Sequence, residues 1–235
     1  MPVNKEAYQL LRKELEEKQV ALVAVSKTKP VEDILALYQL GHRDFGENYV
    51  QEMVTKAGQL PTDIRWHYIG HLQTNKVKLI APFVQLIHAV DSLKLLEEIN
   101  KQGAKCGRVI ACLLQVHIAQ EETKFGLDES EMNDLMSQYR NEKMSNARIV
   151  GLMGMASFTD DMNRVRAEFR FLKTLFDKLR THDADGTVSI QARFAASGLT
   201  TLSMGMSNDY KIAIEEGSNM LRIGSLLFGE REKPA

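Results

Sequence analysis

Short runs of strand character alternate with longer amphipathic segments along most of the chain. In the longer segments, apolar residues recur at the three- and four-residue spacing of a helix face. The strand-like runs lie at 21–26, 43–48, 65–70, 84–90, 108–116, 148–157, 198–206 and 219–229, and the helical segments include 31–40, 92–104, 128–139 and 161–180. Eight strands with helices between them predict repeated β-α units around a parallel sheet.

The alternation fits a closed barrel better than an open sheet. We predict an α/β fold in which residues 1–235 form a single domain, a (β/α)8 TIM barrel. A doubly wound open sheet is the alternative, but no G-x-G-x-x-G motif follows the first strand, where a nucleotide-binding sheet has it. Residues 1–20 space Tyr8, Leu11 and Leu15 at helical intervals, which predicts an extra helix before the barrel.

Composition and charge narrow the classes of function. The chain has 30 basic and 31 acidic residues and a formal net charge of −1, without a basic block, so we expect no nucleic-acid partner. No apolar run approaches the ~20 residues of a membrane span. The charged N-terminal segment is not a secretion signal. With Cys106 and Cys112 as the only cysteines, there is no disulfide framework, and we expect a reducing, cytoplasmic location.

Lys27 is the first residue with the chemistry of a reactive site. It directly follows the first strand-like run, so its amine would point into the mouth of a barrel. Lys29 lies two residues on and therefore on the same side of an extended chain. Two ammonium groups this close, partly removed from water, favour a neutral amine that can condense with an aldehyde. The alternative is that both are solvated loop charges, as most lysines are.

The last two strands supply a predicted phosphate site. Barrels commonly bind phosphate after strands seven and eight, where backbone N–H groups and hydroxyls meet at the start of a helix or turn. The candidate contacts in this sequence are Ser203, Gly205, Ser207, Gly224 and Ser225. Taken singly, each has a structural alternative, such as helix capping for Ser207 or tight packing for Gly224.

Other residues of the strand ends have plainer interpretations. We expect no metal at His67 and His71, because no cysteine or carboxylate accompanies them at ligand spacing. Met153 is predicted to pack in the core and Met206 to contact a ligand ring. In the stretch 120–126, Glu122 and Lys124 are expected to form a surface ion pair.

Six motifs together resemble a known family. They are AVSKTKP, FGENYVQE, WHYIGHLQTNK, LMGMAS, LSMGMSND and RIGSLLFGER, and the likeness extends over residues 5–231. In wording and in order they are similar to the YggS/PROSC family of pyridoxal phosphate homeostasis proteins. The sequence departs from that family's usual wording at His117 and at Asn219.

The resemblance implies a fold, a cofactor and roles for named residues. It implies a barrel similar to the N-terminal domain of alanine racemase, with pyridoxal 5′-phosphate (PLP) held as a Schiff base on Lys27. It also implies that Asn48 lies beside the ring and that Arg222 faces the pyridine nitrogen. Gly224 and Ser225 are expected to join the serines of SMGMS around the phosphate. A guanidinium keeps its protons, so the ring would be a poor electron sink.

Three functions compete at this stage. The first is a protein that carries and buffers PLP, releases it to apo forms of PLP-dependent enzymes, and acts as a monomer without dedicated catalysis. Its rival is a single-domain amino-acid racemase or a similar PLP-dependent enzyme. The third is a barrel without the cofactor, in which Lys27 is a solvent-exposed lysine.

Overall fold

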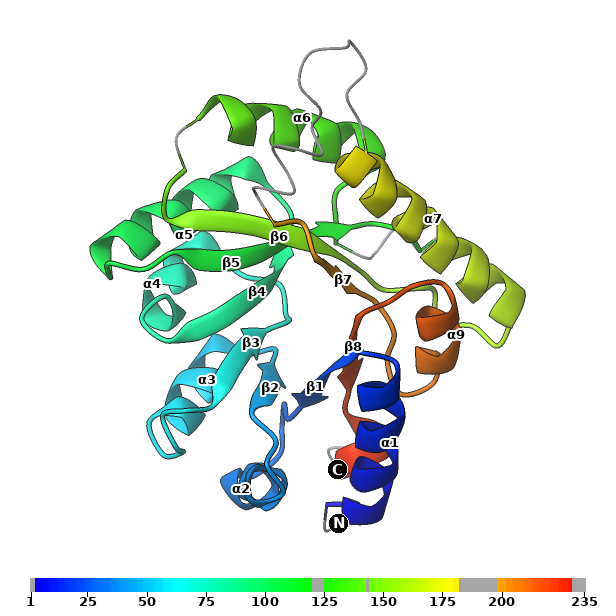
Figure 1. The fold of residues 1–235 in the computed structure, drawn as a ribbon. Helices are drawn as coiled ribbons and strands as arrows, with labels where there is room; N and C mark the ends of the chain where they lie inside the picture. The colour runs from blue at the N-terminus through cyan, green and yellow to red at the C-terminus, as the bar shows by residue number, and fades with distance from the viewer. Residues whose placement is uncertain (1–2, 120–124, 143, 182–197, 230–235) are drawn as a thin grey trace.

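Eight parallel strands close into a barrel in the order in which they occur along the chain (Figure 1). The computed structural model describes residues 3–119, 125–142, 144–181 and 198–229. Parallel pairing of the first strand with both the second and the eighth closes the barrel. The strands are β1 (Ala21–Val25), β2 (Asp44–Glu47), β3 (Arg65–Tyr68), β4 (Val84–Val90), β5 (Ile110–Val116), β6 (Ala147–Gly154), β7 (Thr201–Ser203) and β8 (Met220–Ile223).

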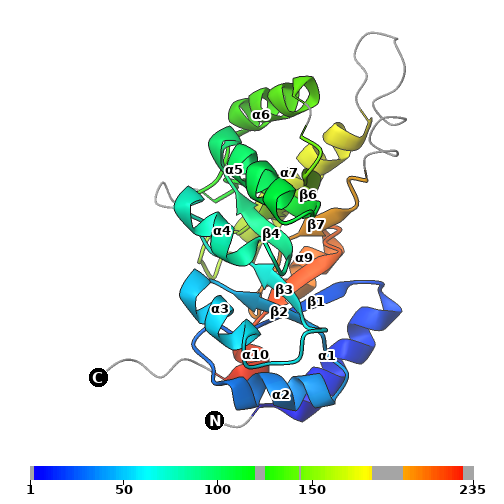
Figure 2. The ribbon, with the colours of Figure 1, turned by 90° about the vertical axis from the view of Figure 1, so that its left-hand side faces the viewer.

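Helices follow the strands and cover the outside of the barrel (Figure 2). Those that precede β5 are α1 (Lys5–Glu17), α2 (Val31–Gln39), α3 (Val50–Ala57), η1 (Thr74–Lys76), α4 (Val77–Ile80) and α5 (Leu93–Lys105). Those that follow β5 are α6 (Glu129–Asn141), α7 (Met162–Thr181), α9 (Tyr210–Glu215) and α10 (Ser225–Phe228). None of the helices in the described ranges is long and apolar enough to cross a membrane.

The predicted barrel is confirmed, and its last two strands are shorter than predicted. The run 198–206 contributes only the three residues of β7, because the chain turns at Gly205, which has a φ of +99°. The run 219–229 is a strand only as far as Ile223. Gly224 ends the strand and begins α10, which a continuous apolar run does not reveal.

The predicted N-terminal helix joins the beginning of the chain to its end. The side chain of Asn4 caps α1 by accepting from the N–H of Ala7 at 3.0 Å. Tyr8, Leu11 and Leu15 form the buried face of the helix. The Asn4 N–H donates to the carbonyl of Leu227 in α10 at 2.8 Å, so the first helix holds the last one in place.

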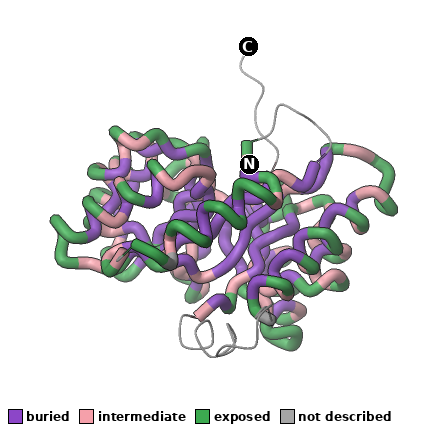
Figure 3. Tube along the Cα trace, turned by 90° about the horizontal axis from the view of Figure 1, so that it is seen from above, coloured by how far each residue is buried: buried purple, intermediate pink, exposed green. Residues whose placement is uncertain are grey.

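The apolar core has two parts. The larger one fills the space between the strands and the helices, so buried residues lie on the strands and on the inward faces of the helices (Figure 3). A smaller cluster of Leu86, Ala89, Leu113 and Met153 packs separately from it. Met153 is fully buried, which confirms its predicted core role.

Candidate ligand pocket at the mouth of the barrel

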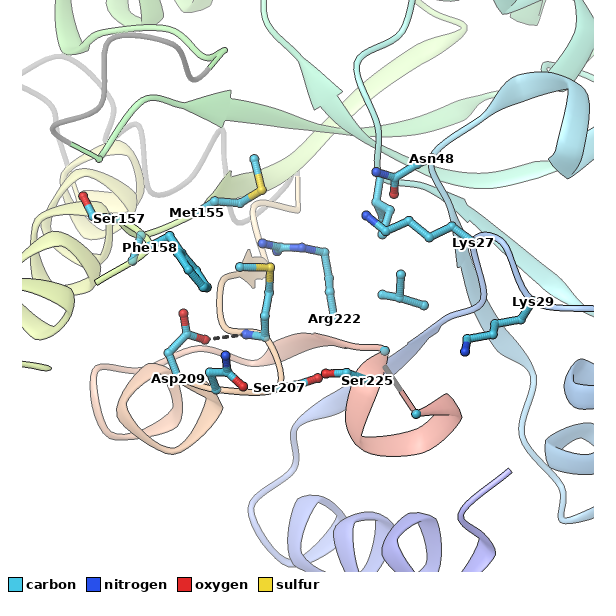
Figure 4. A pocket seen from close by; sticks show the side chains of 17 residues that line it. Lys27, Lys29, Asn48, Met155, Ser157, Phe158, Ser207, Asp209, Arg222 and Ser225 are labelled. Atoms are coloured by element: carbon cyan, nitrogen blue, oxygen red, sulfur yellow. Dashed lines mark hydrogen bonds between the residues drawn. The ribbon is translucent and has the colours of Figure 1, made fainter. Parts of the chain in front are cut away.

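A pocket of about 490 Å³ opens at the carboxyl ends of the strands, where a barrel places its chemistry (Figure 4). Lys27 and Lys29 reach it from the turn after β1, and Asn48 from the end of β2. Arg222 enters from β8. Most of the remaining wall comes from residues after β6, β7 and β8, among them Met155, Ser157, Phe158, Met206, Ser207, Asp209, Gly224 and Ser225.

Strand alternation directs Lys27 into the pocket. Successive side chains of a strand point to opposite faces, so Val25 and Lys27 share one side and Ser26 faces the other. Val25 lines the pocket, and Figure 4 shows the Lys27 side chain extending into it. Ser26 is fully buried and its hydroxyl donates to Glu47 at 2.6 Å. The location of Lys27 in the mouth, which the sequence predicted, therefore follows from the pleat of β1.

A buried ion pair supports the residue that precedes Lys27. The Lys56 ammonium, on α3, donates to the carboxylate of Glu47 at 2.8 Å and to the carbonyl of Ser26 at 2.7 Å. Burial raises the pKa of the Glu47 carboxyl, and the nearby charge and hydrogen bond of Lys56 oppose that rise. Removing two charges from water is costly, so their retention here is consistent with a positional role.

The residue after Lys27 is held in an unusual backbone conformation. Thr28 has a φ of +64°, in the left-handed region that β-branched residues rarely adopt. Its N–H donates to the carboxylate of Glu52 at 2.6 Å, and Glu52 in turn accepts from Lys56 at 2.7 Å. The backbone on both sides of Lys27 is thus fixed by side chains of α3.

Lys29 lines the same pocket but is tied to another element. Its ammonium donates to the carbonyl of Phe228 at 2.8 Å, at the end of α10. The bond links the turn after β1 to the helix that follows β8. Two lysines two residues apart therefore share one pocket, as their spacing predicted.

Arg222 is a buried cation at the pocket. It is 4% exposed, and its guanidinium donates to the hydroxyl and the carbonyl of Ser203 at 2.7 and 2.9 Å, and to the carbonyl of Gly154 at 3.0 Å. Within the described residues these acceptors are neutral groups. Burial lowers the pKa of Arg222 to about 10, which still leaves the guanidinium charged at pH 7.

Asn48 leaves a polar atom without a partner. Its Oδ1 is buried and has no hydrogen-bond partner among the described residues, although the residue lines the pocket. Buried polar atoms are normally hydrogen-bonded, so an unsatisfied one at a pocket wall fits a ligand that brings a donor. Burial of the Arg222 cation among neutral acceptors fits a ligand that brings an acceptor.

Hydroxyls and backbone from the last two strand ends form one wall. Ser207, Gly224 and Ser225 line the pocket, and the Ser207 hydroxyl accepts from the N–H of Leu226 at 3.4 Å. Met206 lines the pocket too and is 37% exposed. Of the predicted phosphate contacts, Ser207, Gly224 and Ser225 are brought together at the pocket.

Two predicted contacts lie elsewhere, and the prediction for them is corrected. Ser203 is fully buried beneath the pocket, where its hydroxyl accepts from Arg222, so it does not present that hydroxyl to a ligand. Gly205 does not line the pocket either. A Cβ added to Gly205 would lie 2.5 Å from the Cβ of Ala213, so packing explains this glycine. Sequence spacing identified the correct strand end but not the depth of each side chain.

Several pocket residues were not singled out from the sequence. Ser157, Phe158 and Asp209 line the pocket, and the Asp209 carboxylate accepts from the N–H of Met206 at 2.6 Å. Their only signal was position, since they follow β6 and β7 at the carboxyl ends of the strands. Glu122 and Lys124 lie outside the described residues.

The two histidines four residues apart have separate environments. His71 stacks on Phe125 at a centroid distance of 4.3 Å, and its Nδ1 lies 3.2 Å from Asp91. His67 is buried and contacts His88 instead. Within the described ranges, no three histidine, cysteine or acidic side chains are grouped so that they could hold a metal ion.

Comparison with known proteins agrees with this fold. A family model described as the N-terminal domain of alanine racemase matches residues 5–232, which defines the class of barrel. The sequence is 38% identical to the pyridoxal phosphate homeostasis protein of Pasteurella multocida over 219 residues, 92% of this chain and 88% of that protein. It is 39% identical to the human pyridoxal phosphate homeostasis protein over 224 residues, 91% of this chain and 78% of that protein. The chain belongs to the family of pyridoxal phosphate homeostasis proteins.

Solved structures show the same architecture. PipY of Synechococcus elongatus with PLP bound has a TM-score of 0.82 at 32% identity, covering 95% of this chain and 99% of that one. The alanine racemase of Bartonella henselae has a TM-score of 0.64 at 17% identity and covers 99% of this chain but 62% of its own, which shows likeness of fold alone.

Proposed function

We propose that this protein binds PLP reversibly through Lys27, and that it carries and buffers the cofactor to maintain the supply of vitamin B6. The observation that supports this most directly is the convergence of Lys27, the unpartnered Oδ1 of Asn48 and the buried guanidinium of Arg222 at one pocket. The family relatives named pyridoxal phosphate homeostasis proteins, and a neighbour solved with PLP, support the same ligand.

Lys27 would supply the covalent link. Bound PLP would supply an electrophilic aldehyde, and the amine of Lys27 would be the group that holds it covalently and reversibly. The fixed backbone at Ser26 and Thr28 holds Lys27 at the pocket, so little freedom is lost when its amine engages a ligand. The role of Lys29 would be to keep the turn after β1 against α10.

The other contacts would orient the cofactor. Ser207, Gly224 and Ser225, which line the pocket, would offer hydroxyls and backbone to the phosphate, Asn48 would lie beside the ring, and Met206 would pack against it. Of the predicted contacts, Ser203 and Gly205 would act only from beneath this surface.

The chemistry of Arg222 favours a carrier over a racemase. A charged guanidinium only donates hydrogen bonds, so it would donate to the pyridine nitrogen and leave it without a proton of its own. A ring without that proton stabilises carbanions poorly. In this proposal the protein acts as a monomer in the cytoplasm and releases PLP to apo forms of PLP-dependent enzymes.

Borohydride trapping tests the proposal. Purified protein supplied with PLP is reduced and digested, and peptide mass spectrometry should find the pyridoxyl group on Lys27. Lys27→Ala should abolish that label, whereas Lys78→Ala, an exposed lysine of α4, should leave it unchanged. Absence of any reduced lysine adduct would contradict the proposal. Racemisation of amino acids by the PLP-loaded protein, lost on Lys27→Ala, would favour the enzyme instead.

A further inference from the structure

A line of hydrogen-bonded side chains runs through the barrel from the pocket to the opposite ends of the strands. Arg222 Nη1 lies 2.7 Å from Ser203 Oγ, which lies 3.3 Å from His88 Nδ1. His88 Nε2 lies 3.0 Å from His67 Nδ1, and His67 Nε2 lies 3.1 Å from the Asp44 carboxylate. These five residues, called the interior chain below, come from five strands: β8, β7, β4, β3 and β2.

The chemistry at its two ends sets the direction of the interior chain. A carboxylate only accepts hydrogen bonds and a guanidinium only donates them. His67 Nε2–H therefore donates a hydrogen bond to Asp44, and Arg222 donates one to Ser203. When both imidazoles are neutral, His67 Nδ1 is then an acceptor and His88 Nε2 is the donor. His88 Nδ1 is left as an acceptor, so the Ser203 hydroxyl donates to it. Every bond points from Arg222 towards Asp44.

Burial favours this neutral arrangement. His88 and Ser203 are fully buried, and His67 is 3% exposed. Burial lowers the pKa of His88 well below its ordinary value, and the nearby charge of Arg222 lowers it further. Asp44 lies at the accessible end, with its side chain 25% exposed and paired with Arg65.

Asp44 places a negative charge at the far end of the interior chain, in addition to Asp209 at the pocket, whose charge favours the charged form of Arg222. In the described part of the chain, the guanidinium contacts only a hydroxyl and two carbonyls. Hydrogen bonds in a row polarise one another, and a carboxylate at the far end makes each acceptor along the row stronger. Ser203, which donates to His88, thereby becomes a better acceptor for Arg222.

We propose that Asp44, His67, His88 and Ser203 are positioning residues that fix the orientation and the charge of Arg222 at the ligand pocket. The inference rests on the proposed function, in which Arg222 faces the ring nitrogen of PLP. Ser203 and two carbonyls occupy three N–H groups of the guanidinium, and the others remain for a ligand in the pocket that Arg222 lines. A residue on the far side of the barrel would then influence the binding of the cofactor without touching it.

The first test determines the direction of the hydrogen bonds in the interior chain, in the protein without ligand. Nitrogen-15 NMR of the imidazoles distinguishes the two neutral tautomers, and we expect both His67 and His88 to carry their proton on Nε2 at pH 8. Asp44→Asn should move the His67 signals and, through them, those of His88. A proton on Nδ1 of His88 would overturn the proposed direction, whatever the protein binds.

The second test measures PLP affinity from the visible absorbance of the bound cofactor. Asp44→Asn keeps an acceptor for His67 but removes its charge, and we expect the Kd to rise about fivefold or more, with a displaced absorbance band. Ser203→Ala should raise it at least as much, and Ser203→Thr, which restores a hydroxyl, should recover most of the affinity.

Asp63→Asn is the matched control, because Asp63 is an exposed carboxylate that pairs with Arg43 outside the interior chain. It should leave the Kd and the band unchanged. Unfolding in urea without PLP shows whether each variant is folded. A folded Asp44→Asn with wild-type Kd and band would overturn the inference and leave PLP binding on Lys27 intact. If the wild type binds no PLP, the proposed function fails, and the NMR result still decides the direction of the interior chain.

Discussion

His42 illustrates how burial of a single residue makes stability depend on pH. It is 8% exposed, it packs edge-on against Tyr8 and Phe45, and its Nε2–H donates to the carbonyl of Asp44 at 2.8 Å. Burial lowers the pKa of His42 to about 4. As the pH falls from about 6.5, the unfolded chain takes up a proton that the folded one takes up only near pH 4. The stability present above about pH 6.5 is therefore lost towards pH 4.

A variant without an imidazole at position 42 should therefore show a weaker dependence of the free energy of unfolding on pH. The free energy of unfolding of His42→Phe, measured in urea across this range, should change less steeply near pH 5 by about 1.4 kcal/mol per pH unit, the slope of one proton. Gln9→Ala, an exposed change in α1 that removes no titratable group, should keep the wild-type slope. Identical slopes for wild type and His42→Phe would show that His42 does not supply this proton.

For single residues, the sequence predicted the side of the strand to which a side chain points better than its depth along the barrel axis. Lys27 could be placed because the period of a strand is two and the run before it is apolar. Ser203 obeys the same rule and points inward, but it lies below the pocket, where it contacts Arg222. How far along the barrel axis a side chain reaches depends on the packing of several strands, which one strand's pattern does not contain.

Among the elements, α3 gives the site its support. Its Lys56 donates to Glu47 and to the backbone of Ser26, and its Glu52 accepts from the backbone of Thr28. This short helix was not singled out from the sequence, because Lys56 in a helix reads as a solvated charge. Its partner in the buried ion pair, the Glu47 carboxylate, comes from β2, so the pairing could be recognised only once the fold was known.

Removal of the Lys56 ammonium should be strongly destabilising. In Lys56→Met, the Glu47 carboxylate, whose side chain is fully buried, keeps the Ser26 hydroxyl but loses its counter-charge. We expect a loss of about 3–5 kcal/mol in the free energy of unfolding, as for other broken buried pairs. The fluorescence of Trp66, the only tryptophan, reports the transition in urea.

Lys78→Met is the matched control in α4, where the lysine is exposed. It should change the free energy of unfolding by about 0.5 kcal/mol or less. If the two variants were equally stable, the buried pair would contribute nothing that methionine cannot replace. Glu47→Gln combined with Lys56→Met should recover part of the loss, because no unpaired charge then remains.

In the whole molecule, closure of the barrel brings the two ends of the chain together. β1 pairs with β8 in register from Ala21 with Met220 to Ala24 with Ile223. The pocket lies across this seam, with Lys27 on one side and Arg222 on the other (Figure 4). The alternation of strands and helices was enough to predict a closed barrel. The role of α1 in holding the seam was not predictable, because an amphipathic pattern shows that a face is buried but not against what.

The seam should therefore be sensitive to a residue far from the pocket. Tyr8 is 1% exposed on the face of α1 that packs against the barrel, and Tyr8→Ala should lower the free energy of unfolding by about 3–5 kcal/mol, as for other large aromatic truncations. Tyr8→Phe keeps the ring and should cost far less. Since α1 also holds α10, hydrogen exchange in Tyr8→Ala should accelerate more in β1 and β8 than in β5, on the opposite side of the barrel. Equal acceleration in all three strands would mean that α1 stabilises the barrel as a whole and gives no particular support to the seam on which Lys27 and Arg222 meet.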